Sequence, residues 1–232
     1  MSALSPRCVQ QVGSFAELRT TPFAGPINAL CWQRTLPGDY TEVVARLGRG
    51  EGILTLEEET LQQLTLSSAG REAANQMLAD LKLLQDHALA PLLNIIHDCG
   101  WSPVGGLVPT DVLSFHVDSA PVEVDTWLCT YHGACSEGLR NEDATRKIDQ
   151  TAIRAALLQE FGGADDAVFA EWLNDYCYDR HYAANPAAIP YPFGTFNLWR
   201  IATLWPESRV LPCIHRAPLT APGDTPRLLL IS

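Results

Sequence analysis

The sequence predicts an all-β core, arranged as a sandwich or barrel, with helices packed outside it. Helical periodicity is concentrated in residues 40–98 and 146–183, whereas residues 101–133 and 191–232 contain short apolar runs punctuated by Pro, Gly and Ser. Hydrophobic residues make up 47% of the 232 residues, which is enough to bury such a core. This order of helices and strands is typical of an α+β chain with a β-rich centre.

The first half of the chain is expected to supply mainly helices. Residues 1–38 are rich in Pro, Gly and Thr and predict a loosely structured arm with one strand at 29–33. Residues 40–47 predict a short amphipathic helix. A longer helix, kinked or divided at Pro91, is expected over 69–98, because apolar residues recur there at spacings of three and four: Ala73, Met77, Leu81 and Leu84.

The second half alternates strands with one helical region. Strands are expected at 112–117, 122–131, 195–204, 209–215 and 227–231. Residues 1–99 would then form an arm and helices that pack on the core. Residues 100–232 would form the core, with a helical insert at about 141–190 that is a candidate lid. We expect the two parts to make one structural unit.

Charge and cysteine content limit the classes of partner. The formal net charge is −11 and the sequence pI is near 4.9, whereas nucleic acids and anionic membranes attract basic surfaces. We therefore expect a small-molecule substrate, no nucleic acid and no membrane, and the sequence indicates no oligomeric state. Residues 1–9 lack the apolar segment of a signal peptide, so the 7 cysteines predict a cytoplasmic protein with reduced thiols.

The motif with the clearest chemistry is His116-Val117-Asp118. Side chains alternate along a strand, so His116 and Asp118 point to the same side. Two histidines and one carboxylate on one side of a metal ion are typical of non-haem Fe(II) oxygenases. A short apolar segment that ends at His215 supplies the second histidine. The three residues predict one divalent metal site, although isolated histidines are more often hydrogen-bonded core residues.

Arg227 follows His215 by twelve positions and opens the apolar run Arg-Leu-Leu-Leu-Ile. A buried arginine is costly unless an anion pairs with it, and a bidentate carboxylate is the best partner. Arg227 is therefore predicted to bind either a carboxylate ligand or an acidic side chain of the protein.

Together these residues resemble the Fe(II)/2-oxoglutarate-dependent oxygenases. More narrowly, the chain resembles a bacterial family known only as domain of unknown function 1826, and the likeness covers roughly residues 100–232. It rests on Phe-His-Val-Asp at 115–118, Cys-Thr-Tyr-His-Gly at 129–133, His-Arg-Ala-Pro at 215–218 and Arg-Leu-Leu-Leu at 227–230. In that family a turn like Gly-Pro-Gly-Thr-Glu-Trp follows the tyrosine. Here Glu137 is kept, but Gly138 takes the place of the tryptophan.

The resemblance implies a double-stranded β-helix, a jelly-roll or cupin-like barrel, that binds Fe(II) and the co-substrate 2-oxoglutarate. The reaction would be a hydroxylase-type oxidation of a small molecule or an amino-acid-like substrate. Arg227 would bind the distal carboxylate of 2-oxoglutarate. Thr130 and Tyr131 are candidates to hydrogen-bond the co-substrate, and the register of the strand decides which of them faces inward. Trp127, Trp199 and Glu137 are candidates for lining the substrate pocket.

Two alternatives remain open at this point. Cys129, His132 and Cys135 are evenly spaced and form a rival zinc site, although a Cys-x-x-Cys pair is absent. A different function is also possible for the same metal ligands. The chain would then be a non-catalytic metal-binding β-barrel protein linked to metal homeostasis or to protein interaction.

Overall fold

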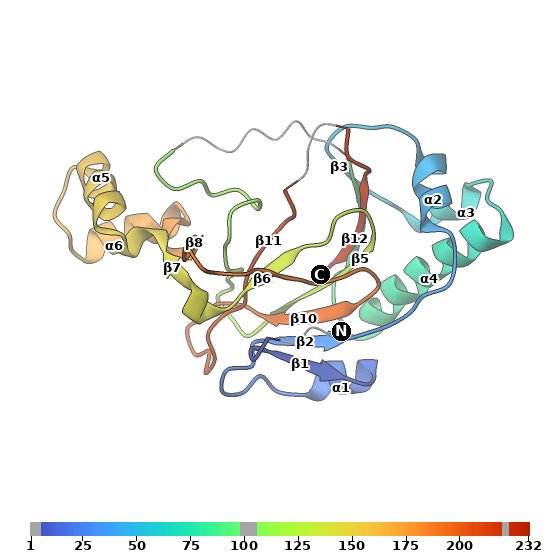
Figure 1. The fold of residues 1–232 in the computed structure, drawn as a ribbon, viewed down its shortest axis with the longest axis horizontal. Coiled ribbons are helices and arrows are strands. Elements are labelled where there is room, and N and C mark those ends of the chain that lie inside the picture. The colour runs from blue at the N-terminus through green and yellow to red at the C-terminus, as the bar shows by residue number, and fades with distance from the viewer. Residues whose placement is uncertain (1–5, 98–105, 220–222) are drawn as a thin grey trace.

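The computed structural model describes residues 6–97, 106–219 and 223–232. It is a mixed α+β fold with one large sheet, two smaller sheets and flanking helices (Figure 1). Within the described residues the strands do not close into a barrel, so the closed form of the expected core is not observed. No helix in these ranges is both long enough and apolar enough to cross a membrane.

The large sheet has seven strands in the order β1-β2-β10-β5-β12-β4-β3. All neighbours pair antiparallel except β1 and β2, which are parallel. The first 99 residues supply four of these strands, β1 to β4, in addition to the expected arm and helices. The bounds of the seven strands are β1 Val9–Val12, β2 Ala29–Trp32, β3 Ile53–Thr55, β4 Leu92–Ile96, β5 Asp125–His132, β10 Leu198–Ala202 and β12 Arg227–Ile231.

A second sheet has the order β11-β6-β9, and its strands are β6 Glu137–Leu139, β9 Tyr191–Pro192 and β11 Ile214–Arg216. His116 forms an isolated antiparallel bridge with His215 and thereby extends this sheet beyond β11. The third sheet joins β7 (Ala144–Arg146) to β8 (Tyr182–Ala184).

Helices cover one face of the large sheet, and they are α1 Phe15–Thr20, α2 Tyr40–Leu47, α3 Glu58–Gln63 and α4 Ser68–Gln85. Helix α2 begins after Asp39, whose carboxylate accepts a hydrogen bond from the Glu42 N–H, and it ends at Gly48, which has a φ of 81°. Apolar side chains of α2 and α4, such as Val43 and Met77, pack against alternate residues of β5. The expected helix at 40–47 is thus confirmed.

The opposite face of the large sheet, here called the inner face, packs against the β11-β6-β9 sheet. This second core contains Cys31, Leu128, Trp199, Ile201 and Leu229 from the large sheet, with Tyr191, Phe193 and Cys213 from the other side. Because side chains alternate along a strand, neighbouring residues of β5 belong to different cores. Leu128 lies in the core between the sheets, whereas Trp127, Cys129 and Tyr131 lie under the helices.

The insert between β6 and β9 carries α5 (Thr151–Phe161) and α6 (Ala167–Asp175), as the sequence predicts. It has three short 3-10 helices, at Asn141–Asp143, Lys147–Asp149 and Tyr178–Arg180. Its helices share a small core that includes Leu157 and Phe169 and stand apart from the large sheet (Figure 1). Near β7 and β8, the insert packs on the outer face of the β11-β6-β9 sheet through Tyr182 and Ala188.

Three predicted elements differ from the structure. The helix expected over 69–98 ends at Gln85, and residues 92–96 are the strand β4, because pairing with β12 decides between helix and strand for a short apolar run. Residues 112–117 contribute only the bridge at His116. The strand expected at 209–215 is shortened to β11.

Candidate metal centre

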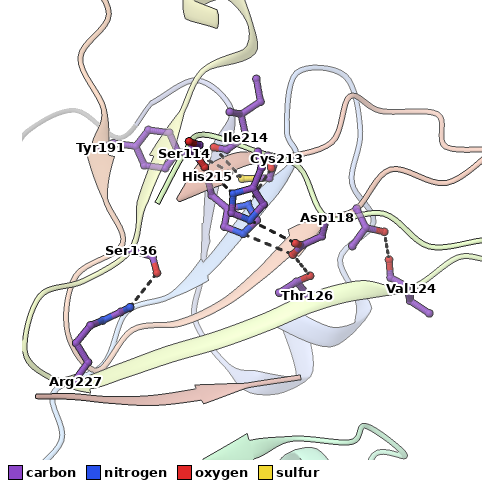
Figure 2. Close-up of polar contacts among 12 residues, drawn as sticks. Ser114, Asp118, Val124, Thr126, Ser136, Tyr191, Cys213, Ile214, His215 and Arg227 are labelled. Atoms are coloured by element: carbon purple, nitrogen blue, oxygen red, sulfur yellow. Dashed lines mark hydrogen bonds and ion pairs between the residues drawn. The ribbon is translucent and has the colours of Figure 1, made fainter. Parts of the chain in front are cut away.

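The structure brings His116, Asp118 and His215 together between the two sheets. Figure 2 shows the carboxylate of Asp118 beside His215 and Thr126. The N–H of His116 donates to the carbonyl of His215 at 2.9 Å, and the reverse hydrogen bond is also 2.9 Å. Directly opposed residues of an antiparallel pair place their side chains on the same side, and the two imidazole centroids are 4.6 Å apart. One ligand atom from each of the three residues lies within 4.8 Å of the others.

Each imidazole is oriented by a backbone carbonyl. The Nδ1 of His116 lies 2.8 Å from the carbonyl of Ser114, and the Nδ1 of His215 lies 3.2 Å from the carbonyl of Cys213. An Nδ1–H that donates to a carbonyl leaves Nε2 with a free lone pair, which is the form that binds metal ions. The Nε2 atoms of His116 and His215 face the carboxylate of Asp118 at 3.8 Å and 3.6 Å respectively.

Thr126 holds the carboxylate of Asp118. Its hydroxyl, from the inner face of β5, donates to Asp118 Oδ2 at 2.5 Å. The side chain of Asp118 is 35% exposed, whereas those of His116 and His215 are 13% and 11% exposed. The cluster is therefore closed on the histidine side and open on the carboxylate side. Thr126 was not predicted from the sequence. Alternation along β5 puts it on the same face as Thr130, and this is the signal that could have identified it.

The electrostatics favour the neutral form of His116. Burial, together with the neighbouring His215, lowers the pKa of His116 to about 4. His181, another residue that the sequence analysis missed, bridges to the backbone of His116 and stacks on its ring at a centroid distance of 5.8 Å. Burial also lowers the pKa of His181, whose Nδ1 lies 2.8 Å from the carbonyl of Cys177. Neutral imidazoles are the form that coordinates metal ions.

Arg227 is buried on the inner face with few partners. It is two residues before Leu229, which packs between the sheets, so both side chains point the same way. Arg227 is 5% exposed, and its Nη2 donates to the hydroxyl of Ser136 at 3.2 Å (Figure 2). Its Nε has no hydrogen-bond partner, and no ion pair joins it to an acidic side chain in the described ranges. Burial lowers the pKa of Arg227 to about 10.

The two residues predicted to hydrogen-bond the co-substrate lie on opposite faces of β5. Thr130 is 2% exposed and belongs to the inner face. Its hydroxyl has no nitrogen or oxygen hydrogen-bond partner among the described residues, and it interacts with the thiol of Cys135. Tyr131 points under the helices instead, where its hydroxyl donates to Asp80 Oδ2 at 2.7 Å. Tyr131 therefore does not lie with Arg227, because consecutive residues of a strand face opposite sides.

The structure separates the three residues proposed to line a substrate pocket. Trp127 packs under the helices against Phe15, at a ring distance of 5.8 Å. Glu137 pairs with Arg216 at 2.7 Å, and its strand neighbour Gly138, not Glu137, is the residue opposite His215. The contacts described for these two residues include none with the metal ligands, and their place in a substrate pocket stays a prediction.

Trp199 lines a cavity with a volume of about 550 Å³. The cavity lies over β1, β2 and β10, and its other walls include Gln11, Cys31, Ile189, Tyr191 and Phe193. Among the described residues that line it, none is a ligand of the candidate metal centre. Tyr191 lies next to both places, because it pairs with Gly138, which in turn pairs with His215.

The rival zinc site does not form. The thiol of Cys129 lies under the helices and accepts a hydrogen bond from Arg34 at 3.4 Å. The Nδ1 of His132 lies 2.9 Å from the carbonyl of Pro226, and the thiol of Cys135 interacts electrostatically with Arg227. Within the described ranges, one group of His, Cys, Asp and Glu side chains has metal-ligand spacing, and it is the group of His116, Asp118 and His215.

Comparison with known protein families, curated proteins and solved structures gives no match for this chain. The resemblance to domain of unknown function 1826 and to the Fe(II)/2-oxoglutarate oxygenases therefore stays a prediction.

Proposed function

We propose that this chain is an Fe(II)/2-oxoglutarate-dependent oxygenase that carries out a hydroxylase-type oxidation of a small-molecule or amino-acid-like substrate. The observation that carries the proposal is Arg227. A buried guanidinium without an acidic partner is costly, and this one lies on the same inner face as Thr126, which holds Asp118. A carboxylate bound beside the metal centre would provide the missing partner.

We also propose that the fold is a double-stranded β-helix, as in the family of domain of unknown function 1826. The support is the path of the chain between the two facing sheets. It runs from β4 in the large sheet to His116 in the small one, and back to β5. It continues to β6 and β9 in the small sheet, β10 in the large, β11 in the small and β12 in the large. The chain thus changes sheet at every step of this path except from β6 to β9, and such alternation between two facing sheets is typical of a jelly roll.

The donor set fits Fe(II). Two neutral imidazoles and one carboxylate on one side of an ion are the facial arrangement of non-haem iron sites, although Mn, Co, Ni and Zn accept the same donors. When bound, Fe(II) with 2-oxoglutarate supplies oxygen activation. His116, Asp118 and His215 would hold the metal, and Thr126 would orient the carboxylate of Asp118.

The co-substrate would extend from the metal toward β12. Arg227 would bind its distal carboxylate, and the hydroxyl of Thr130, which has no nitrogen or oxygen partner in the described ranges, would donate to it. Leu128 and Leu229 are buried on the same inner face, so they would exclude water from the bound 2-oxo acid.

The first test is anaerobic addition of Fe(II) and then 2-oxoglutarate. We expect a weak visible charge-transfer band that is absent from the His215→Ala variant, because that variant lacks one metal ligand. Absence of the band in the wild-type chain would refute the proposed function. Metal binding without 2-oxoglutarate binding would favour the non-catalytic metal-binding protein instead.

The second test separates Arg227 from the metal ligands. Replacing a buried charged partner of a carboxylate costs about 2–5 kcal/mol, so Arg227→Met should weaken 2-oxoglutarate binding by about 30-fold or more. Metal affinity should stay as in the wild type. Arg209→Met is the matched control, because Arg209 is exposed. Unchanged co-substrate affinity in Arg227→Met would contradict the role given to this residue.

The location of the protein is part of the same proposal. The six described cysteines are all free thiols, which fits the cytoplasmic environment that the sequence predicts.

A further inference from the structure

The turn after β5 wraps the side chain of Arg227. Ser136 accepts the hydrogen bond from Arg227 Nη2. At the other end of the turn, a Cβ placed on Gly133 would lie 2.9 Å from the carbonyl oxygen of Pro226 and 3.1 Å from Cα and Cγ of Arg227. Cys135 lies between Gly133 and Ser136 in the chain. Its thiol is close enough to the guanidinium of Arg227 for the two groups to interact electrostatically.

Cys135 differs from most other thiols of the chain in its access to solvent. Of the six described cysteines, Cys8, Cys31, Cys129 and Cys213 are buried, whereas Cys135 and Cys177 are half-buried. Cys177 follows α6 in the insert, on a segment far from Arg227 in the fold (Figure 1). Cys177 is therefore an internal reference of similar exposure, and the cation near it, Arg180, is ion-paired with Asp179 at 3.8 Å.

The surroundings of Cys135 indicate an anionic ligand. Among the described residues, the Nε of Arg227, which is 95% buried, has no hydrogen-bond partner. The hydroxyl of Thr130, which is 98% buried, has no nitrogen or oxygen partner there and interacts with the thiol of Cys135. Both groups are donors on the inner face, and buried donors are normally satisfied. A small carboxylate would satisfy them, and its remaining atoms would lie within reach of the thiol.

We propose that Cys135 is a carboxylate-directed modification site. A small electrophile that carries a carboxylate binds to Arg227 through that carboxylate and reacts with the thiol. The carboxylate of the adduct then occupies the anion position and excludes 2-oxoglutarate. This last consequence rests on the proposed function, whereas the modification itself needs neither metal nor co-substrate.

Two classes of reagent can alkylate the Cys135 thiol in this way. With a 2-halo carboxylate such as iodoacetate, the S–C bond forms, the C–I bond breaks, iodide leaves and the thiol proton passes to the buffer. With an α,β-unsaturated carboxylate, the S–C bond forms at the β-carbon and the C=C π bond is consumed. The thiol proton is then replaced by a proton on the α-carbon.

Absolute rates are a poor readout here. Burial raises the pKa of the Cys135 thiol, and the guanidinium of Arg227 only partly offsets this, so every alkylating agent reacts slowly at Cys135. The ratio of rates for a charged and a neutral reagent at the same thiol cancels that intrinsic reactivity. The ratio reports only how strongly the site attracts the carboxylate.

The experiment compares iodoacetate with iodoacetamide on the metal-free protein, with alkylation at Cys135 and Cys177 measured by peptide mass spectrometry. We expect the iodoacetate-to-iodoacetamide ratio to be about tenfold higher at Cys135 than at Cys177, since one nearby charge contributes on the order of 1–4 kcal/mol at short range. In Arg227→Met the ratio at Cys135 should fall to that at Cys177, and Arg227→Lys should retain part of it. Equal ratios at the two thiols of the wild type, or a ratio unchanged in Arg227→Met, would overturn the proposal.

A competition in the wild-type chain removes any dependence on the folding of a variant. Added 2-oxoglutarate or succinate should slow carboxymethylation at Cys135 and leave Cys177 unchanged. Equal protection of both thiols, or of neither, would count against the site.

The consequence for the proposed function is tested separately. Carboxymethylated wild-type protein should lose 2-oxoglutarate binding and keep metal binding, whereas Cys135→Ser should bind 2-oxoglutarate before and after the treatment. If Cys135 is modified in an Arg227-dependent way but 2-oxoglutarate never binds, the modification site stands and the oxygenase proposal fails. If 2-oxoglutarate binds but the alkylation ratios at Cys135 and Cys177 are equal, the proposed function stands and the modification site fails.

Discussion

Thr126 is the residue whose contribution to the metal centre can be measured most cleanly. Its hydroxyl donates to Asp118 Oδ2 at 2.5 Å. The two histidine Nε2 atoms approach the same carboxylate at 3.6 and 3.8 Å, so this hydrogen bond fixes the direction of Asp118 toward them. Thr126→Val removes the hydroxyl and keeps the shape of the side chain. A hydrogen bond to a charged group contributes about 1.5–3 kcal/mol, so metal affinity should fall by about 10- to 100-fold.

The assay is anaerobic calorimetric titration with Fe(II), repeated with Mn(II), which does not oxidise readily. Thr126→Ser is the matched control, because it keeps the donor and should bind metal nearly as tightly as the wild type. A Val variant within twofold of the wild-type affinity would refute the reasoning. So would a Ser variant as weak as the Val variant, since the hydroxyl would then not be the group that matters.

Two further predictions test neighbouring parts of the fold. In Gly138→Ala the new Cβ would lie 2.3 Å from Cζ of Tyr191, so the ring must move. The free energy of unfolding, measured in urea titrations, should therefore fall by about 1–3 kcal/mol. A smaller residue in place of Tyr191 should restore part of this loss. Glu137→Gln breaks the partly exposed pair with Arg216, so it should cost at most about 1 kcal/mol and leave metal titrations unchanged. Loss of metal binding in that variant would place Glu137 at the centre after all.

The ligand set could be predicted from the sequence because two of its members are fixed by local geometry. His116 and Asp118 are two residues apart, and the spacing alone puts them on one side. The position of His215 depends on a backbone pairing between segments far apart in the chain, so the sequence indicated it only through the short apolar segment that ends there and through the resemblance. The hydrogen bond from Thr126 to Asp118 joins a strand to a loop, so it depends on the folded structure and not on local spacing.

Which side chains of β5 face the space between the sheets could not be predicted from the sequence, and the reason is physical. Both faces of this strand are buried, one under the helices and one between the sheets. Hydrophobic alternation tells inside from outside only when one face meets water. Thr130 and Tyr131 were therefore equally plausible as co-substrate residues, and so was Trp127 as a pocket residue. The structure puts Thr130 alone on the inner face.

The segment before His116 was predicted as a strand because it is apolar. The carboxylate of Asp111 instead accepts hydrogen bonds from the N–H groups of Leu113 and Ser114, at 3.0 and 2.9 Å. Such an Asx turn competes with strand pairing. Because of this turn, His116 pairs only as a single bridging residue. Ser114, whose carbonyl lies next to the Nδ1 of His116, is at the end of the turn.

The contrast between two buried arginines supports the reading of Arg227 as a ligand-binding residue. Arg34 makes a bidentate pair with Asp80 at 2.6 and 2.8 Å, so its charge is compensated inside the protein. Arg227 has no such partner among the described residues. Arg34→Met leaves Asp80 buried and unpaired, and should lower the free energy of unfolding by about 3–5 kcal/mol.

Arg227→Met should have the opposite effect on the metal-free protein. It removes a buried donor that is left unsatisfied, so the free energy of unfolding should stay constant or rise by about 1–3 kcal/mol, while 2-oxoglutarate binding is lost. Urea titrations of both variants, with and without 2-oxoglutarate, measure the difference. A residue kept at a cost to stability is explained by the ligand that it binds. If Arg227→Met destabilises the protein as much as Arg34→Met does, Arg227 has a structural partner and the argument for a carboxylate ligand fails.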